Sequence, residues 1–199
     1  NDVVLGQAIG ETNTVLGYFM QMENDGLAEH SGLPLPQFMI RVDSVADQLP
    51  KGGKEIPQAY RPVLNVATIA LALTEGFYNA LPDSSGIVRY VPLFIRSEGT
   101  LYPHLTLEMI REAMYQEGVQ EDPKLAVGAN GIIGIMLGNR LVPTDRKARL
   151  LINYRGYQRM FPYVSATDIV SGDPDALSAV EGKFVLIGTS TWGLRDLRA

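Results

Sequence analysis

Hydroxyl side chains follow an apolar run near the end of the chain, and they are the residues most suited to chemistry. Residues 184–198 read FVLIGTSTWGLRDLR. The apolar run Phe184–Ile187 ends at Gly188, and Thr189 and Ser190 come next. An apolar run of this length, stopped by glycine, predicts a buried central strand. Because open α/β sheets place ligands at the C-terminal ends of their strands, we expect a functional loop at this point.

Two kinds of enzyme would use such hydroxyl groups. The segment Gly188–Gly193 is close to the G-x-S-x-G turn of serine hydrolases, but it has one residue too many before the second glycine. A nucleophilic serine needs a base, and the chain has only His30, in an irregular segment, and His104, at a helix start where an exposed or capping histidine is usual. No lysine follows in the P-loop pattern. A small α/β hydrolase or anion-binding enzyme that uses Ser190 or Thr189 stays open as the alternative.

A second group with binding chemistry lies in the stretch INYRGYQRMFPY, residues 152–163. It brings together aromatic and basic side chains, namely Tyr154, Arg155, Tyr157, Arg159 and Tyr163. Such a group could grip an anionic or planar ligand. The simpler interpretation is a solvated strand end whose arginine stems lie along apolar surface.

Metal and cofactor sites are not expected. The chain has no cysteine and two histidines at unrelated positions, which leaves only carboxylates as ligands. The aspartates, among them Asp43, Asp47 and Asp83, show no calcium-loop spacing. The pair in Asp173-Pro174-Asp175 is interpreted as a turn.

The composition indicates a globular protein of ordinary size. The chain has 199 residues, of which 46% are hydrophobic and 20% charged, enough for a sizeable core. Its net charge of −5 argues against nucleic acid as a partner, which would require a basic stripe. The longest apolar run, VATIALAL at Val66–Leu73, is too short to cross a bilayer. No signal peptide is visible, and the missing initiator methionine predicts a processed fragment.

The first half of the chain predicts a helix, a strand and an irregular insertion. A helix opens the chain and a strand follows at Thr14–Met20. Five prolines and a Gly-Gly pair mark residues 21–62 as an irregular insertion that holds a short helix near Asp43–Leu49. An alanine-rich helix then leads to a strand at Gly76–Asn79.

The second half predicts hairpins between helices. Pro92 suggests an edge or a bulge in a strand over Ile87–Arg96. Pro103 suits the first turn of a helix. Two glycine turns, the second at Gly138-Asn139, predict a meander over residues 125–154. A strand is expected at Arg149–Tyr154, and a helix capped by Ser165 and ended by Gly172 follows it. The helix after Pro103 is expected to bury an apolar stripe of Leu105, Met109, Ile110, Ala113 and Met114. The fold class is therefore α/β, a mixed β-sheet with antiparallel hairpins flanked by helices in a single domain.

Three blocks of sequence together resemble a known family. They are DSSGIVRYVPLFIRSEGTLYPHLTLEMIREAM at Asp83–Met114, LLINYRGYQRMFPYVSATDIVSGDPDALSAVEGKFVLIGTSTWGLRDLR at Leu150–Arg198 and, more weakly, DVVLGQAIGETNTVLGYF. In this order they resemble the second subtype of the CHASE domain, a sensory module of cyclases and histidine kinases. Ser85 stands where that family usually has aspartate, and His104 where it usually has serine.

The resemblance implies a non-catalytic sensory domain outside the cytoplasm, anchored by transmembrane helices beyond this segment and coupled to a cyclase, histidine kinase or other kinase. The resemblance predicts that residues 1–199 form one domain. This domain is expected to lack the strand-helix-strand portion that begins the usual module. A small-molecule or other stimulus, no cofactor and a possible homodimer are expected. A ligand is expected near Asn79, Arg89, Tyr154, Arg155, Thr189 and Ser190. Coupling to the membrane is expected at Gly188, Gly193, Arg195 and Asp196.

Overall fold

The computed structural model describes residues 2–27, 40–41, 55–69, 74–157 and 160–188. It confirms the α/β class, with mixed and antiparallel sheets and helices. The chain divides into a first unit, Asn1–Ile152, and a second unit, Asn153–Ala199, which are described one after the other. The assignment of residues 1–199 to one domain, with residues 21–62 as an insertion, stays a prediction.

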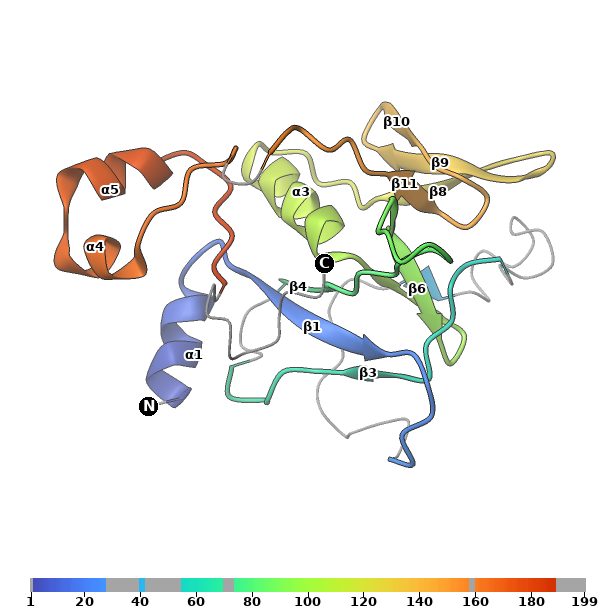
Figure 1. Ribbon diagram of the computed structural model, residues 1–199, viewed down its shortest axis with the longest axis horizontal. Coiled ribbons are helices and arrows are strands. Elements are labelled where there is room, and N and C mark those ends of the chain that lie inside the picture. Colours follow the sequence, from blue (N-terminus) through green and yellow to red (C-terminus); the bar gives the residue numbers. More distant parts are fainter. Residues whose placement is uncertain (1, 28–39, 42–54, 70–73, 158–159, 189–199) are drawn as a thin grey trace. The chain divides into compact units, whose positions relative to one another are not determined.

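A mixed sheet lies at the start of the first unit. Helix α1 (Asp2–Gly10) leads into β1 (Val15–Gln21), so the predicted helix and strand are confirmed. Strand β1 is the middle strand of this sheet, antiparallel to β3 (Arg61–Val63) and parallel to β4 (Thr74–Phe77), as Figure 1 shows. Tyr18 lies opposite Phe77 in the parallel register, and all four residues of β4 are buried.

The alanine-rich helix predicted after residue 61 is wrong for the residues that the structure describes there. Residues 61–63 form β3, and only a turn follows at residues 67–69. The physical reason is that the start of this stretch pairs with the open edge of β1, where Val63 lies opposite Phe19. Residues 70–73 lie outside the described residues. So does the predicted short helix at Asp43–Leu49.

A hairpin and a two-stranded ladder form the middle of the unit. Strands β6 (Phe94–Ser97) and β7 (Thr100–Pro103) make an antiparallel hairpin, and β2 (Ile40–Arg41) pairs with the other edge of β7. Strand β5 (Tyr90–Pro92) pairs instead with β11 (Arg149–Leu151). The single strand predicted over residues 87–96 is therefore broken at Leu93, directly after Pro92, as the proline suggested.

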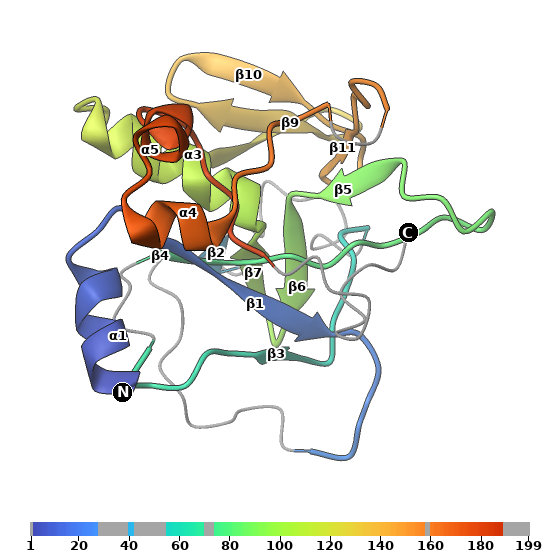
Figure 2. The same cartoon turned by 60° about the vertical axis from the view of Figure 1, so that its left-hand side comes forward.

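The predicted meander is confirmed as β8 (Lys124–Gly128), β9 (Gly131–Leu137) and β10 (Arg140–Pro143), with β9 in the centre (Figure 2). Gly138, with a φ of 56°, turns the β9–β10 hairpin at the predicted Gly-Asn pair. The predicted strand at Arg149–Tyr154 is the shorter β11, because only three of its residues pair with β5.

Among the described residues, two apolar clusters form the core, and the β6–β7 hairpin contributes to both. Phe94 and Leu101 belong to a cluster with the helix residue Leu107 and the β9 residues Ile132 and Ile135. Their neighbours Ile95 and Tyr102 belong to a second cluster with Tyr18, Met20 and Phe77 of the mixed sheet. Successive side chains of a strand point to opposite faces, so the hairpin is buried on both faces.

Helix α3 (Leu105–Gln116) confirms the predicted helix but differs from the prediction in two ways. Pro103 ends strand β7 and His104 is the N-cap, so the helix begins two residues later than Pro103 implied. The buried residues of α3 are Leu107, Glu108 and Arg111, whereas Ile110 of the predicted stripe is exposed. A charged pair can take buried positions because its members neutralise each other, and apolar periodicity does not detect such a pair.

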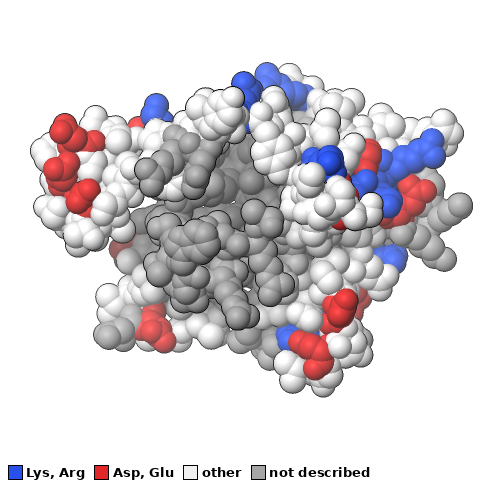
Figure 3. Space-filling view, viewed as in Figure 1, with Lys and Arg blue, Asp and Glu red and all other residues white. Residues whose placement is uncertain are grey.

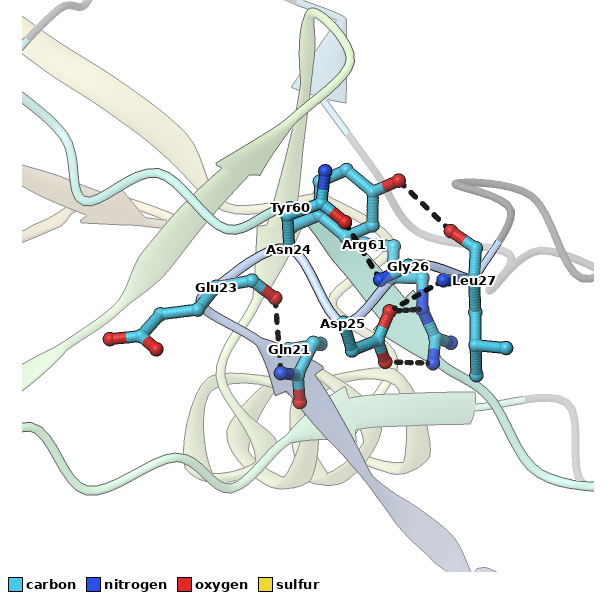
Figure 4. A network of polar contacts seen from close by, with 8 residues as sticks. All are labelled: Gln21, Glu23, Asn24, Asp25, Gly26, Leu27, Tyr60 and Arg61. Carbon is cyan, nitrogen blue, oxygen red and sulfur yellow. Dashed lines mark hydrogen bonds and ion pairs between the residues drawn. The ribbon is translucent and has the colours of Figure 1, made fainter.

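An ion pair fixes the loop that follows β1, as Figure 4 shows. The guanidinium of Arg61 donates to both oxygens of Asp25, at 3.2 and 2.5 Å. Asp25 also accepts from the backbone N–H of Leu27, whose carbonyl accepts from the Tyr60 hydroxyl. Bonding to Arg61 lowers the pKa of the Asp25 carboxyl. This network ties Asp25 and Leu27 to the start of β3.

In the second unit, the described residues form two short helices. Ser165 caps α4 (Ala166–Ser171) and Gly172 ends it in the left-handed conformation, as the sequence predicted. The interpretation of Asp173-Pro174-Asp175 as a turn is wrong. Asp173 accepts from the backbone N–H of Ala176 and Pro174 opens the first turn, so this segment begins α5 (Pro174–Val180). Acidic side chains gather over these helices (Figure 3).

The buried strand predicted at Phe184–Ile187 is also wrong in this structure. The segment has no strand conformation, and its four apolar side chains are exposed, Ile187 by 95%. A strand exists only where a neighbouring backbone pairs with it, and no described strand pairs with these residues. The apolar run alone could not supply that partner.

Candidate functional site

Asn79, predicted as a ligand-binding residue, is buried and has a structural partner. Its side-chain oxygen accepts from the backbone N–H of Met20, and its amide nitrogen donates to the carbonyl of the same residue, both at 2.7 Å. This pair of bonds imitates a strand partner for the end of β1. Asn79 therefore has no free polar group of its side chain directed at a ligand.

Arg89, the second predicted residue, belongs to a charged turn on the surface. Asp83 and Arg89 form an ion pair, and Arg89 also donates to the Ser85 hydroxyl at 2.8 Å. One oxygen of Asp83 accepts from the backbone N–H and the hydroxyl of Ser85 and from the backbone N–H of Ile87. These bonds, with those of Ser85 foremost, hold the pKa of Asp83 far below its usual range. Ser85 thus serves the turn that Asp83 organises.

Tyr154 and Arg155, which are consecutive in the sequence, line the same surface hollow in the second unit. The hollow, of about 260 Å³, is also lined by Gly156, Tyr157, Met160, Phe161 and Tyr163. All of these lining residues fall between positions 154 and 163, and no described residue from elsewhere in the chain lines the hollow. The hollow is open, and the Tyr157 side chain is 92% exposed. Among the described residues, Arg155 has no ion-pair partner.

Gly156 shapes the bend in this loop. Its φ of 135° lies in the region that side chains disfavour. A Cβ at this position would lie 2.9 Å from the Cγ atom of Met160. The glycine therefore leaves room for the Met160 side chain to lie against the backbone at this bend.

Most of the predicted terminal loop lies outside the described residues. This applies to Thr189, Ser190, Gly193, Arg195 and Asp196. Gly188 is described, and a Cβ added to it would meet no atom within 4 Å. The structure therefore places none of the hydroxyl groups on which the hydrolase alternative depends.

The start of α3 holds a group of buried polar side chains that the sequence prediction did not select. Glu108 is fully buried and accepts from the guanidinium of Arg111 at 2.7, 3.1 and 3.2 Å. Burial raises the pKa of Glu108 to about 7, although Arg111 acts in the opposite direction. On β4, burial also raises the pKa of Glu75, which accepts from Asn65 at 2.8 Å.

The residues that sequence reasoning missed carried different signals. Met160 and Phe161 lie inside the aromatic–basic stretch and could have been included with Tyr154. Glu108 and Arg111 have the three-residue spacing of a helical ion pair, but this spacing is common on exposed helix faces and does not mark burial. The capping role anticipated for His104 is confirmed, because its ring accepts from the backbone N–H of Thr106 at 3.2 Å.

The described side chains offer groups that can bind and position a ligand. No cluster of three or more histidine, aspartate or glutamate residues suited to a metal occurs in the part of the chain that the structure describes. Within the same part, no helix combines the length and apolar character needed to cross a membrane. The hollow at Tyr154 and Arg155 offers aromatic faces and one guanidinium, which suit a planar anion.

Comparison with known proteins identifies a family. The model of the CHASE2 domain matches residues 2–199, nearly the whole chain. No curated protein and no solved structure matches the chain.

Proposed function

The chain belongs to the CHASE2 domain family, whose members are extracellular sensory domains associated with signalling proteins, and we propose that it is the input domain of a membrane-anchored protein of this kind. The match over residues 2–199 carries the proposal. The output would be an adenylate or guanylate cyclase, a histidine kinase or another kinase. The domain itself would bind and relay, and its parent would carry the catalytic activity.

The hollow at Tyr154 and Arg155 is the favoured place for a ligand. Its aromatic side chains would stack on a flat molecule, and Arg155 would pair with a carboxylate or phosphate group. We therefore propose a small planar anion as the stimulus bound in the second unit. Asn79 and Arg89 have other partners, which makes them less suitable.

Replacing Arg155 with glutamine is expected to weaken binding of a planar anion, because the cation that pairs with it is lost. Benzoate and a nucleoside monophosphate are suitable probes, measured by calorimetry with the whole chain. We expect at least roughly tenfold weaker binding, equivalent to one charge-assisted hydrogen bond. Arg146→Gln is the matched control, because it removes an exposed arginine of the first unit. Equal binding by Arg155→Gln and the wild type would reject this site.

The segment from Gly188 to Asp196 is proposed to couple the domain to its membrane anchor. Deleting residues 188–196 from the full-length protein is expected to abolish regulation of the output, while basal output persists because the catalytic domain is untouched. Output activity with and without stimulus is the measurement. A deletion variant that still responds as the wild type does would contradict the coupling role. Replacement of the segment by nine glycine and serine residues separates the effect of sequence from that of length.

A further inference from the structure

His104 caps a helix with an imidazole ring where a hydroxyl or carboxylate is usual. It lies between β7 and α3 with extended backbone, at φ −72° and ψ 148°. Its Nδ1 accepts from the backbone N–H of Thr106 at 3.2 Å and lies 2.9 Å from the Thr106 hydroxyl oxygen. The first turn of α3 therefore depends on an unprotonated ring nitrogen.

Packing around the ring excludes solvent. His104 is 8% exposed, and its ring meets the ring of Phe77 edge-on, with centroids 5.0 Å apart. Its backbone N–H donates to the carbonyl of Leu93, and its carbonyl accepts from the N–H groups of Leu107 and Glu108. The histidine is thus fixed to strand β4, to the β5–β6 junction and to the helix at once.

The elements that pack against one another at this junction, namely α3, β1, β4 and β7, carry several charged and titratable groups. They are Glu108, Arg111 and Glu112 of α3, Glu75 of β4, Tyr18 of β1 and Tyr102 of β7. Glu108 is committed to Arg111, Glu75 accepts from Asn65, and Glu112 bonds to Thr74 and Gln116. Burial of the ring lowers the pKa of His104 from 6.5 to about 4.

We infer that the His104 cap makes the start of α3 an acid-sensitive joint, which means that the first helical turn opens when the ring of His104 binds a proton. Protonation of Nδ1 removes the acceptor for the Thr106 N–H, and the first helical turn loses its cap. The new positive charge also lies at the N-terminus of the helix, where the helix dipole is itself positive and repels it. Both effects favour a state in which the first turn is open and the imidazolium reaches water.

The sign of the pH dependence follows from the direction of the shift. The pKa of His104 is lowered from 6.5 to about 4 in the folded chain, so the folded state binds the proton less readily than the unfolded state. The contribution of the neutral ring to stability is complete above the unfolded pKa and is lost as the pH falls through the folded one.

Opening of this turn would reach the rest of the first unit through close contacts. The Cα atom of Leu105 would lie 2.5 Å from a Cβ at Gly76, so the helix start rests directly on β4. Leu107, in the same turn, belongs to the apolar cluster of β6 and β9. If the chain is the sensory domain proposed above, a proton is a stimulus that this joint can detect. The joint itself does not depend on that role.

Hydrogen exchange and a ring titration test the joint in the whole chain. Between about pH 7.5 and pH 4, and after correction for intrinsic exchange, amides of the first turn of α3 should lose at least about tenfold of their protection, because opening of the turn returns a ring with a pKa of about 4 to its usual 6.5. Amides of β9 should change less. The ring signals of His104 should titrate near 4, and His30→Gln assigns them, because the chain has only two histidines.

His104→Ser supplies the decisive variant, since a serine caps the helix without titrating in this range. It should show no loss of protection in the first turn between pH 7.5 and pH 4. A wild-type ring that titrates near 6.5, or an equal acid-induced loss of protection in His104→Ser, would overturn the inference. If His104→Ser fails to fold, the ring titration of the wild type and the variant His104→Asn decide the question. Failure of the joint would leave the family assignment and the coupling test unaffected.

Discussion

Replacing Arg111 with methionine is expected to destabilise the first unit by about 3–5 kcal/mol, because it leaves a buried carboxyl without its cation. Glu108 is fully buried on α3, and Arg111 supplies the only bidentate donor bound to it among the described residues. The abandoned carboxyl can lose its charge only by binding a proton. The cost should therefore grow as the pH rises. Denaturant unfolding at several pH values measures it.

Two controls separate this effect from a general loss of packing. The double variant Glu108→Leu/Arg111→Met removes both charges, and it should recover most of the stability, since apolar pairs of similar volume replace buried ion pairs well. Lys124→Met breaks the exposed pair with Glu121, which is 3.9 Å long, and should cost less than about 1 kcal/mol. A double variant as unstable as Arg111→Met would contradict the charge-based explanation.

The same pH series reveals the titration of Glu108 in the wild type. Burial raises the pKa of its carboxyl from 4.5 to about 7. A raised pKa means that the folded state favours the protonated form, so this contribution to stability is complete below 4.5 and is lost as the pH rises through 7. The Glu108→Leu/Arg111→Met variant should show a flatter profile above pH 6. The contribution of His104 has the opposite sign, because it is complete above pH 6.5 and is lost as the pH falls through 4.

Gly76→Ala is expected to cost about 3 kcal/mol, the upper end for overpacking of a core. The new Cβ would lie 2.5 Å from the Cα atom and 2.7 Å from the backbone nitrogen of Leu105. Backbone atoms at a helix start cannot rotate away, so α3 as a whole would have to move off β4. Thermal or denaturant unfolding measures the loss.

Gly17→Ala is the matched control, because Gly17 lies directly opposite Gly76 in the parallel register of β1 and β4. Its Cβ would meet the Cδ1 atom of the Tyr78 ring at 2.9 Å. Tyr78 is 54% exposed, so its ring can turn aside, and we expect a loss below about 1.5 kcal/mol. Equal losses in the two variants would show that close approach of α3 is not the cause.

Features coded by neighbouring residues could be predicted from the sequence. Ser165 and Gly172 fix the ends of α4 by their own bonds and conformation, and the Gly138-Asn139 turn fixes the β9–β10 hairpin. Pro92 marked the break between β5 and β6 because it lacks a backbone donor. Each of these signals is complete within a few residues.

Features that need a distant partner could not be predicted. Phe184–Ile187 has the composition of a buried strand, but composition does not specify which backbone would pair with it. The buried face of α3 was missed because Glu108 and Arg111 are polar when considered singly and become suitable for the core only as a pair. For the candidate site, Tyr154 and Arg155 were predicted together, whereas the bonds of Asn79 to Met20 depend on a residue 59 positions away.

The β6–β7 hairpin connects the two apolar clusters of the first unit. Phe94 and Ile95 are consecutive along one backbone, yet each belongs to a different apolar cluster. A shift of this backbone by one residue would exchange the two faces and ruin both interiors together. The two apolar clusters are therefore coupled through this backbone, and a rearrangement of one cluster must also disturb the other.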